Sequence, residues 1–190
     1  MSYYLYGASV QGIQSFIFQT NKLKDIVGAS AMVDLICTEW FDPFAQDGVS
    51  IQRAAGNVKH LYYSEEACRK AVREFPKRVM TGAPGITISQ AVVRYEDENG
   101  YEDAALKLEQ RLREQRNRPA ASLTLGLMGI ERSRTTGLPA AEIQDDEWLD
   151  YATCENQSYG TKNVSLCQRA FGVNNVNASV VPFDIEAITQ

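Results

Sequence analysis

The residues best suited to binding a ligand are polar and small side chains near the end of the first apolar segment and in a later turn. The set comprises Ser9, Gln11, Gln14, Lys22, Lys24, Ser30, Gly56 and Asn57. Small residues allow close backbone approach, and N–H groups at the start of a helix can receive a phosphate whose charge the two lysines could neutralise. We therefore interpret the set as a nucleotide-binding or interface surface. The alternative is that Gln11 and Gln14 only face solvent.

Residues that could act in catalysis or hold a metal are few. The single histidine, His60, lies on a predicted strand, where a satisfied structural histidine is more common than a ligand or base. The four cysteines are Cys37, Cys68, Cys154 and Cys167, and no two of them form a C-x-x-C pair. We therefore expect no zinc and no intrinsic cofactor. Cys37 and Cys68, on predicted helices, should be buried thiols in a reducing compartment.

Bulk composition narrows the function classes. The chain has 190 residues, 44% of them hydrophobic, and a net charge of −5. This charge argues against nucleic-acid backbone binding over a broad surface, although local basic patches are compatible with it. The N-terminal sequence has no apolar segment of signal-peptide or membrane-spanning length. We expect a cytoplasmic protein with no membrane partner.

Periodicity and turns predict the elements that position these residues. A strand around Tyr3–Tyr6 runs into a helix after Gly12, and a second helix follows with its core face ending at Trp40. Two strands, over 49–55 and 58–63, flank Gly56-Asn57 and predict a β-hairpin with a primed turn. A helix begins after the N-cap Ser64, and a strand over 86–95 closes the series. The order β-α-α-β-β-α-β predicts an α+β, ferredoxin-like palm fold.

Several finer features accompany this order. Pro76 predicts a kink or break near Phe75 in the third helix. A helix over 101–117 should bury Tyr101 with Ala104 or Ala105 and two leucines, and residues 123–127 permit one more strand. The acidic residues between 145 and 150 are typical of a solvated face. We divide the chain into a palm-like core (1–96), an additional helix and possible strand (97–140), and an irregular C-terminal extension (141–190) that could lead into a further domain.

The N-terminal stretch resembles the first palm domain in the large subunit of type III CRISPR effector complexes. In that family a small-residue turn precedes Gly-Ile-Gln-x-Phe-Ile-Phe and then Leu-Lys-x-Ile-x-Gly-Ala-Ser. The corresponding segments here are Gly12–Phe18 (GIQSFIF) and Leu23–Ser30 (LKDIVGAS). The match spans two helices with the correct spacing, continues less sharply to about Ala140, and fades after that.

The resemblance also identifies what is missing. Catalytic palms hold two divalent ions with carboxylates at the end of the first strand and on the central hairpin. Here these places read Gly7-Ala8-Ser9 and Ala54-Ala55-Gly56-Asn57, without an acid. One neutral asparagine does not build a Mg²⁺ site. In the family the first palm supports a catalytic one, so the resemblance and the departure agree. The segment 131–140, where relatives can carry a cysteine-based zinc element, has no cysteine.

The resemblance implies a non-catalytic palm module of a CRISPR-type nucleotide cyclase or polymerase that acts in antiviral defence. It would support ATP binding and cyclic oligoadenylate synthesis beside a catalytic palm, with no catalytic activity of its own. Its partners would be a second palm (in the same protein, a homodimer or a partner chain) and CRISPR-type ribonucleoprotein subunits. One alternative is a nucleotide-independent assembly module that docks protein or guide-RNA complexes. A third class is an active cyclase with metal ligands drawn from Asp25, Asp34 or Asp42.

Overall fold

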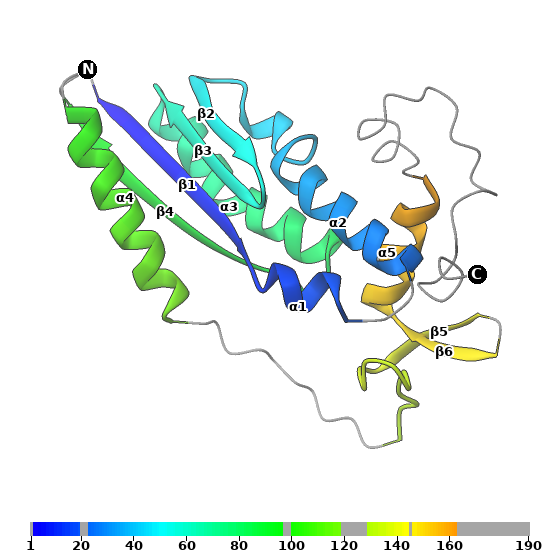
Figure 1. Ribbon diagram of the computed structural model, residues 1–190. Coiled ribbons are helices and arrows are strands. Elements are labelled where there is room, and N and C mark those ends of the chain that lie inside the picture. The colour runs from blue at the N-terminus through cyan, green and yellow to red at the C-terminus, as the bar shows by residue number, and fades with distance from the viewer. Residues whose placement is uncertain (1, 20–22, 97–99, 119–128, 145, 163–190) are drawn as a thin grey trace. The chain divides into compact units, whose positions relative to one another are not determined.

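The computed structural model describes residues 2–19, 23–96, 100–118, 129–144 and 146–162 (Figure 1). Its elements in chain order are β1 (Tyr3–Gln11), α1 (Ile13–Ile17), α2 (Leu23–Cys37), the 3-10 helix η1 (Asp42–Phe44), β2 (Val49–Ala54), β3 (Asn57–Tyr62), α3 (Glu65–Gly82), β4 (Thr87–Tyr95), α4 (Tyr101–Arg116), β5 (Ala140–Gln144), β6 (Glu147–Asp150) and α5 (Tyr151–Lys162). They form two compact units, which are described separately. The first comprises Met1–Ile13, Val33–Gly82 and Ile86–Thr124, and the second comprises Gln14–Met32, Ala83–Gly85 and Leu125–Gln190.

A four-stranded antiparallel sheet in the order β2-β3-β1-β4 forms the centre of the first unit. The chain reaches it in the sequence β-α-α-β-β-α-β, as the periodicity predicted, so the α+β, ferredoxin-like palm fold is confirmed. The central strand β1 pairs with β3 and, over its whole length, with β4. The first strand therefore runs to Gln11, well beyond the predicted Tyr3–Tyr6, because small and polar residues continue the ladder between two neighbours.

The β2–β3 hairpin has the predicted primed turn, but one residue earlier than the sequence suggested. The central residues are Ala55 and Gly56, with φ angles of 53° and 75°, and both lie in the left-handed region that a type I′ turn requires. Asn57 belongs to β3 instead, where it pairs with Ser9 of β1. A Cβ at Gly56 would lie 2.6 Å from Ile13 Cδ1, so the turn packs closely on the start of the first helix.

One face of the sheet packs against α3 through a cluster of aromatic rings. Phe41 lies at its centre, with ring centroids 5.1 Å from Phe75 and 6.1 Å from Tyr6. Tyr62 also lies in this core, and its hydroxyl donates to the Phe44 carbonyl at 2.8 Å. All five side chains are at most 8% exposed. Aromatic pairs in such offset and edge-on arrangements stabilise a core beyond the area that they bury.

The helix α3 continues through Pro76, so the predicted alternative of a break near Phe75 is wrong. Proline has no N–H to donate to the carbonyl four residues earlier, which here belongs to Val72. The side chain of Gln90 on β4 replaces that donor, with Nε2 2.9 Å from the Val72 oxygen. The same amide accepts a hydrogen bond from the Tyr6 hydroxyl at 3.0 Å. The sheet thus supplies the hydrogen bond that the helix lacks.

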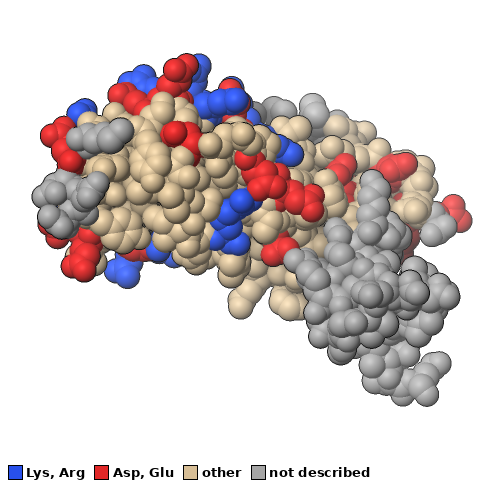
Figure 2. Space-filling model, turned by 90° about the horizontal axis from the view of Figure 1, so that it is seen from above, with Lys and Arg blue, Asp and Glu red and all other residues tan. Residues whose placement is uncertain are grey.

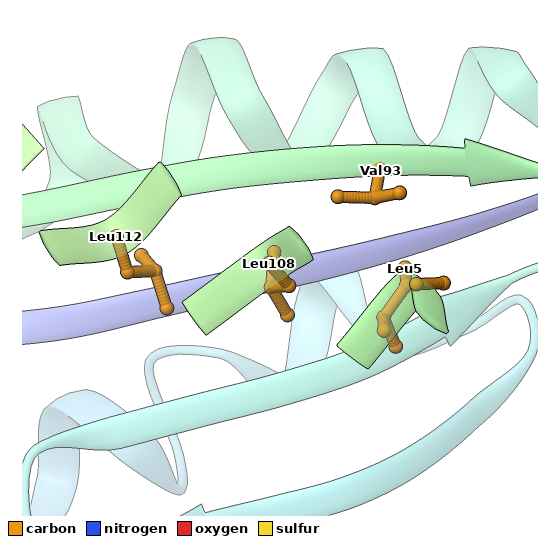
Figure 3. Packing of buried hydrophobic residues seen from close by; sticks show 5 residues of the cluster. Leu5, Val93, Leu108 and Leu112 are labelled. Atoms are coloured by element: carbon orange, nitrogen blue, oxygen red, sulfur yellow. The ribbon is translucent and has the colours of Figure 1, made fainter. Parts of the chain in front are cut away.

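The helix α4 covers the opposite face of the sheet. Adjacent residues of a strand point to opposite faces, so Leu5 and Gly7 lie on the other side from Tyr6. Figure 3 shows the resulting cluster, which comprises Leu5, Val93, Ala104, Leu108 and Leu112. A Cβ at Gly7 would lie 2.9 Å from Leu108, which shows how closely the helix approaches. Tyr101, predicted to be buried, is 37% exposed because it lies in the first turn of the helix, outside this cluster.

The thiols of Cys37 and Cys68 are buried, as expected from their positions on helices. Burial raises the pKa of each thiol to about 11, so both stay protonated and uncharged at neutral pH. No helix among those described combines the length and the apolarity needed to cross a membrane.

The second unit contains regular structure where the sequence showed little periodicity. Strands β5 and β6 form an antiparallel hairpin, and α5 follows directly. Asp150 is 1% exposed, so it is not part of a solvated acidic face. Its carboxylate accepts from the Thr153 N–H at 3.1 Å and the Thr136 hydroxyl at 2.7 Å, and thereby caps α5. The predicted strand over 123–127 lies outside the described residues.

Candidate functional site

The structure brings part of the predicted set together where β1 meets the β2–β3 hairpin. Ser9 and Asn57 are direct partners in the β1–β3 ladder. Gly56 occupies the adjoining turn, and its carbonyl accepts from the Val10 N–H at 2.7 Å. Gln11 ends β1 and donates from Nε2 to the Ser9 carbonyl at 3.1 Å. Strand pairing therefore accounts for four of the eight predicted residues at one end of the sheet.

A small polar pocket of about 230 Å³ opens beside this pair. Its lining residues are Ala8, Ser9, Gln52, Asn57, Val58, Lys59, Glu109, Leu112 and Arg116. Lys59 of β3 and Glu109 of α4 form an ion pair of 2.5 Å across it, and Arg116 adds a second cation from the last turn of α4. The pocket therefore carries two cations against one carboxylate, next to hydroxyl and amide groups. Such a wall suits a phosphate or another small anion.

The amides at this site are fixed by local hydrogen bonds. Asn57 Nδ2 donates to the Ala55 carbonyl at 3.0 Å, as Gln11 does to that of Ser9. Each bond uses an amide N–H and holds the side chain in one orientation, while the amide oxygen remains an acceptor. Both residues are half-buried rather than simply solvated. The site can thus offer preoriented polar groups.

The remaining predicted residues are not brought to this pocket by anything the structure shows. Gln14 on α1 and Ser30 on α2 are exposed and belong to the second unit. Lys24 lies in the first turn of α2, and Lys22 lies outside the described residues. Lys59, which is not in the predicted set, lines the same pocket as Ser9. A substitution at Lys59 is therefore no control for one at Ser9.

Sequence reasoning missed three pocket residues on α4. Glu109, Leu112 and Arg116 are spaced by three and four positions, so they share one face of the helix. That spacing was visible in the sequence. What the sequence could not show is that this face lies over the Ser9 end of the sheet, because that depends on tertiary packing of Leu112 near Gly7.

The acidic residues considered as metal ligands do not converge. Asp25 and Asp34 are nine residues apart on α2, which is two and a half helical turns, so they point to opposite sides. The Asp42 carboxylate instead pairs with Arg53 at 2.5 Å. Among the residues that the structure describes, no group of three or more histidines, cysteines or carboxylates is arranged to hold a metal ion.

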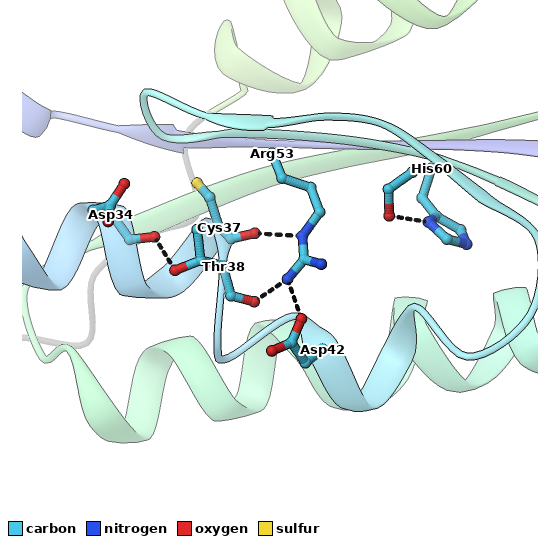
Figure 4. Close-up of polar contacts among 7 residues, drawn as sticks. Asp34, Cys37, Thr38, Asp42, Arg53 and His60 are labelled. Atoms are coloured by element: carbon cyan, nitrogen blue, oxygen red, sulfur yellow. Dashed lines mark hydrogen bonds and ion pairs between the residues drawn. The ribbon is translucent and has the colours of Figure 1, made fainter.

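Arg53 holds the end of α2, which explains the position of Asp42 (Figure 4). Its Nε donates to the Cys37 carbonyl at 3.0 Å, and its guanidinium also contacts the Thr38 carbonyl. Carbonyls in the last turn of a helix lack partners within the helix and carry partial negative charge. The guanidinium satisfies them and is itself neutralised by Asp42. This cluster is structural.

His60 is a buried structural residue (Figure 4). Its Nε2 lies 2.6 Å from the Asp47 carbonyl, which can only accept, so Nε2 carries the proton. Its Nδ1 lies 2.9 Å from Ser50 Oγ and accepts from that hydroxyl when the ring is neutral. Burial lowers the pKa of His60 from its ordinary value of 6.5, against the raising effect of the Asp47 carbonyl.

We expect the free energy of unfolding to fall as the pH is lowered from 7.5 to 5.5. The unfolded chain takes up a proton near pH 6.5, whereas folded His60 does so only at lower pH, so its contribution is complete above 6.5 and is lost as the pH falls through the folded pKa. The slope can reach about 1.4 kcal/mol per pH unit. Urea unfolding at several pH values measures it. Because His60 is the single histidine, His60→Gln should flatten the profile, and an unchanged slope in that variant would contradict the assignment.

Comparison with known proteins shows a similarity of fold. No protein-family model and no curated protein matches the sequence. The structure is similar to the diguanylate cyclase SiaD from Pseudomonas aeruginosa, solved with its activator SiaC, over 62% of this chain and 47% of that chain, with 12% identity and a TM-score of 0.50. A chain of the Csm1–Csm4 cassette with pppApApA matches over 69% of this chain and 21% of its own length, with 16% identity and a TM-score of 0.49.

The same cassette in complex with cA4 matches over 61% of this chain and 19% of that chain, with 15% identity and a TM-score of 0.47. The matched part thus spans about a fifth of the cassette chains and about half of SiaD. At these identities the likeness concerns the fold alone. The first unit is a mixed α+β domain with a ferredoxin-like palm fold.

Proposed function

We propose that this chain is a non-catalytic palm module of a CRISPR-type nucleotide cyclase or polymerase. It supports ATP binding and cyclic oligoadenylate synthesis by a catalytic palm supplied by the same protein, by a second copy or by a partner chain. The proposal draws on the resemblance over Gly12–Phe18 and Leu23–Ser30, and on the palm fold of the first unit. The Ser9 pocket is the candidate nucleotide contact.

The observation that carries the proposal is the chemistry at the ends of β1 and the hairpin. In a catalytic palm these places hold carboxylates for two metal ions. Here they hold Ser9 and Asn57 beside a pocket with two cations, Lys59 and Arg116. A hydroxyl, an amide and cations can bind phosphate oxygens, but they are poor ligands for Mg²⁺. The arrangement fits binding without metal-dependent activation.

The size of the pocket favours a shared site. Pockets that enclose a whole small-molecule ligand have volumes of roughly 300–1,000 Å³. The pocket beside Ser9 has about 230 Å³, which suffices for a phosphate-bearing part of a nucleotide. The remainder of the nucleotide would be covered by the second palm. Small and amide-bearing residues at the pocket rim suit a partly wet contact with that palm.

Replacing Ser9 with aspartate should weaken ATP binding by about tenfold or more, because a carboxylate about 4 Å from a phosphate costs roughly 1 kcal/mol in water and more near a protein surface. Isothermal titration of the full chain with ATP measures the affinity. Thr135→Asp provides a matched control, since it adds the same charge at an exposed turn of the second unit.

Unchanged ATP affinity in Ser9→Asp would contradict the nucleotide contact. If Ser9→Asp instead altered the oligomeric state or partner binding while the chain bound no ATP, the result would favour the alternative of a nucleotide-independent assembly module. Equal losses in Ser9→Asp and Thr135→Asp would mean that only the net charge matters.

A further inference from the structure

A second and larger pocket lies at the β4 edge of the sheet, away from the hairpin. Strand β4 is an edge strand, and the pocket lies along it between α3 and α4, with a volume of about 670 Å³. Its lining residues are Tyr4, Glu65, Cys68, Arg69, Val72, Arg73, Val92, Val93, Arg94, Lys107 and Arg111. All of them belong to the first unit. None of them lines the Ser9 pocket.

The walls of this pocket are strongly basic in a chain that is acidic as a whole. Five cationic side chains line it against the single carboxylate of Glu65, although the chain carries a net charge of −5. Figure 2 shows acidic and basic side chains interspersed over the face that it draws. A concentration of one sign around a hollow raises the local concentration of ions of the opposite sign.

Four of the cations come in two pairs, one on each of the two helices that line the pocket. Arg69 and Arg73 are four residues apart on α3, and Lys107 and Arg111 are four residues apart on α4. Residues at this spacing lie on one helix face, about 6 Å apart along the axis. Two pairs of cations that line one pocket can neutralise successive negative charges along one ligand.

Most of this positive charge is not neutralised within the pocket. The Glu65 carboxylate pairs with Arg69 at 2.7 Å and accepts from the Tyr4 hydroxyl at 3.0 Å. Arg94 pairs with Glu96, outside the lining. Among the described residues, Arg73 and Lys107 have no ion-pair partner. These two side chains, one from each helix, are available to an anionic ligand.

The floor of the pocket is apolar and its strand edge is already occupied. Cys68, Val72 and Val92 provide uncharged surface, and burial raises the pKa of the Cys68 thiol to about 11, so it adds no negative charge. The Arg111 guanidinium donates to the Val92 carbonyl at the edge of β4. An added peptide strand would have to displace this contact, which disfavours a β-strand ligand. The apolar floor instead suits the bases or sugars of a nucleic acid, and the basic walls suit its phosphates.

We propose that the pocket between α3, α4 and the edge of β4 binds a chain of phosphates, either in single-stranded nucleic acid or in the polyphosphate of a nucleotide. Arg73 and Lys107 contact phosphates from opposite walls, and the valine floor lies under the attached base or sugar. This site is separate from the Ser9 pocket and does not depend on the function proposed for it.

The test uses the full chain and two probes, a short fluorescently labelled single-stranded RNA and unlabelled ATP as competitor. Neutralising both cations (Arg73→Gln with Lys107→Gln) should weaken RNA binding on the order of 25-fold near 0.1 M salt, since each phosphate contact contributes about 0.7 to the slope of log K against log salt. Fluorescence anisotropy between 50 and 200 mM salt should also show that slope reduced by about 1.4.

A matched control neutralises one exposed arginine on each of the same helices, outside the pocket: Arg78→Gln with Arg113→Gln. This pair should leave affinity within about twofold, and both variants should melt at the wild-type temperature. Displacement of RNA by ATP at stoichiometric occupancy would assign the phosphate chain to a nucleotide, and failure of ATP to compete would assign it to nucleic acid. The proposal is wrong if wild type binds neither probe, or if the control pair loses as much affinity as the pocket pair.

Discussion

Replacing Gln90 with methionine should lower the free energy of unfolding by about 2 kcal/mol, because two partly buried hydrogen bonds are lost. Gln90 Nε2 serves the Val72 carbonyl, which Pro76 leaves without a helical partner, and Gln90 Oε1 accepts from the Tyr6 hydroxyl. Tyr6 is fully buried, so water cannot replace the lost bond. Methionine has a similar volume, so the change isolates the polar interactions. Urea unfolding measures it.

A second substitution distinguishes this account from a simple packing defect. Pro76→Ala restores the N–H that can bond the Val72 carbonyl within α3, so Gln90→Met should cost about 1 kcal/mol less in that background. Gln52→Met, on exposed β2, is the matched control and should change stability by less than about 0.5 kcal/mol. If Gln90→Met costs the same with alanine or proline at position 76, Gln90 does not compensate for the proline.

The fold follows from local patterns that survive into the tertiary structure. Alternation along β4 and the turn residues of the hairpin predicted the antiparallel sheet, and helical periodicity predicted a buried helix face that ends at Trp40, which is buried although it lies just beyond α2. These signals are local because strand and helix periodicities depend on which face is buried. Their order in the chain then fixes the palm topology.

Two sequence-based predictions failed for the same physical reason: a hydrogen-bond partner lies outside the local segment of the chain. Pro76 normally ends a helix, but Gln90 on a distant strand supplies its missing hydrogen bond. Asp150 belongs to an acidic run, yet it is buried and accepts a hydrogen bond from Thr136, 14 residues earlier in the chain. Tertiary partners of this kind override local preference.

The two candidate sites also could be predicted from the sequence only in part. That Ser9 and Asn57 lie near each other could be anticipated from their places after the first strand and in the hairpin turn, but their pairing in the β1–β3 ladder could not. The basic pocket could not, although the four-residue spacing of Arg69 with Arg73 is visible in the sequence. That α3 and α4 present cations toward the same edge of β4 depends on helices packing against opposite faces of one sheet. Single-sequence periodicity contains no such information.

The prediction with the largest expected effect is that this chain catalyses no metal-dependent reaction of ATP. Two-metal catalysis in palm domains depends on carboxylates that neutralise phosphate charge and activate a hydroxyl. This chain has Ser9 and Asn57 at the corresponding strand ends, and its described carboxylates form no metal-sized group. ATP binding at the Ser9 pocket should therefore need no divalent ion, and bound ATP should remain unreacted.

The most direct test incubates the full chain with radiolabelled ATP, with Mg²⁺, with Mn²⁺ and with chelator, and separates products by chromatography while binding is measured in parallel. The account predicts ATP binding that is equal with and without metal, is weakened by Ser9→Asp, and yields no linear or cyclic oligonucleotide. A metal-dependent product that Asp25→Ala or Asp34→Ala abolishes would contradict it, and would show that this palm is itself an active cyclase.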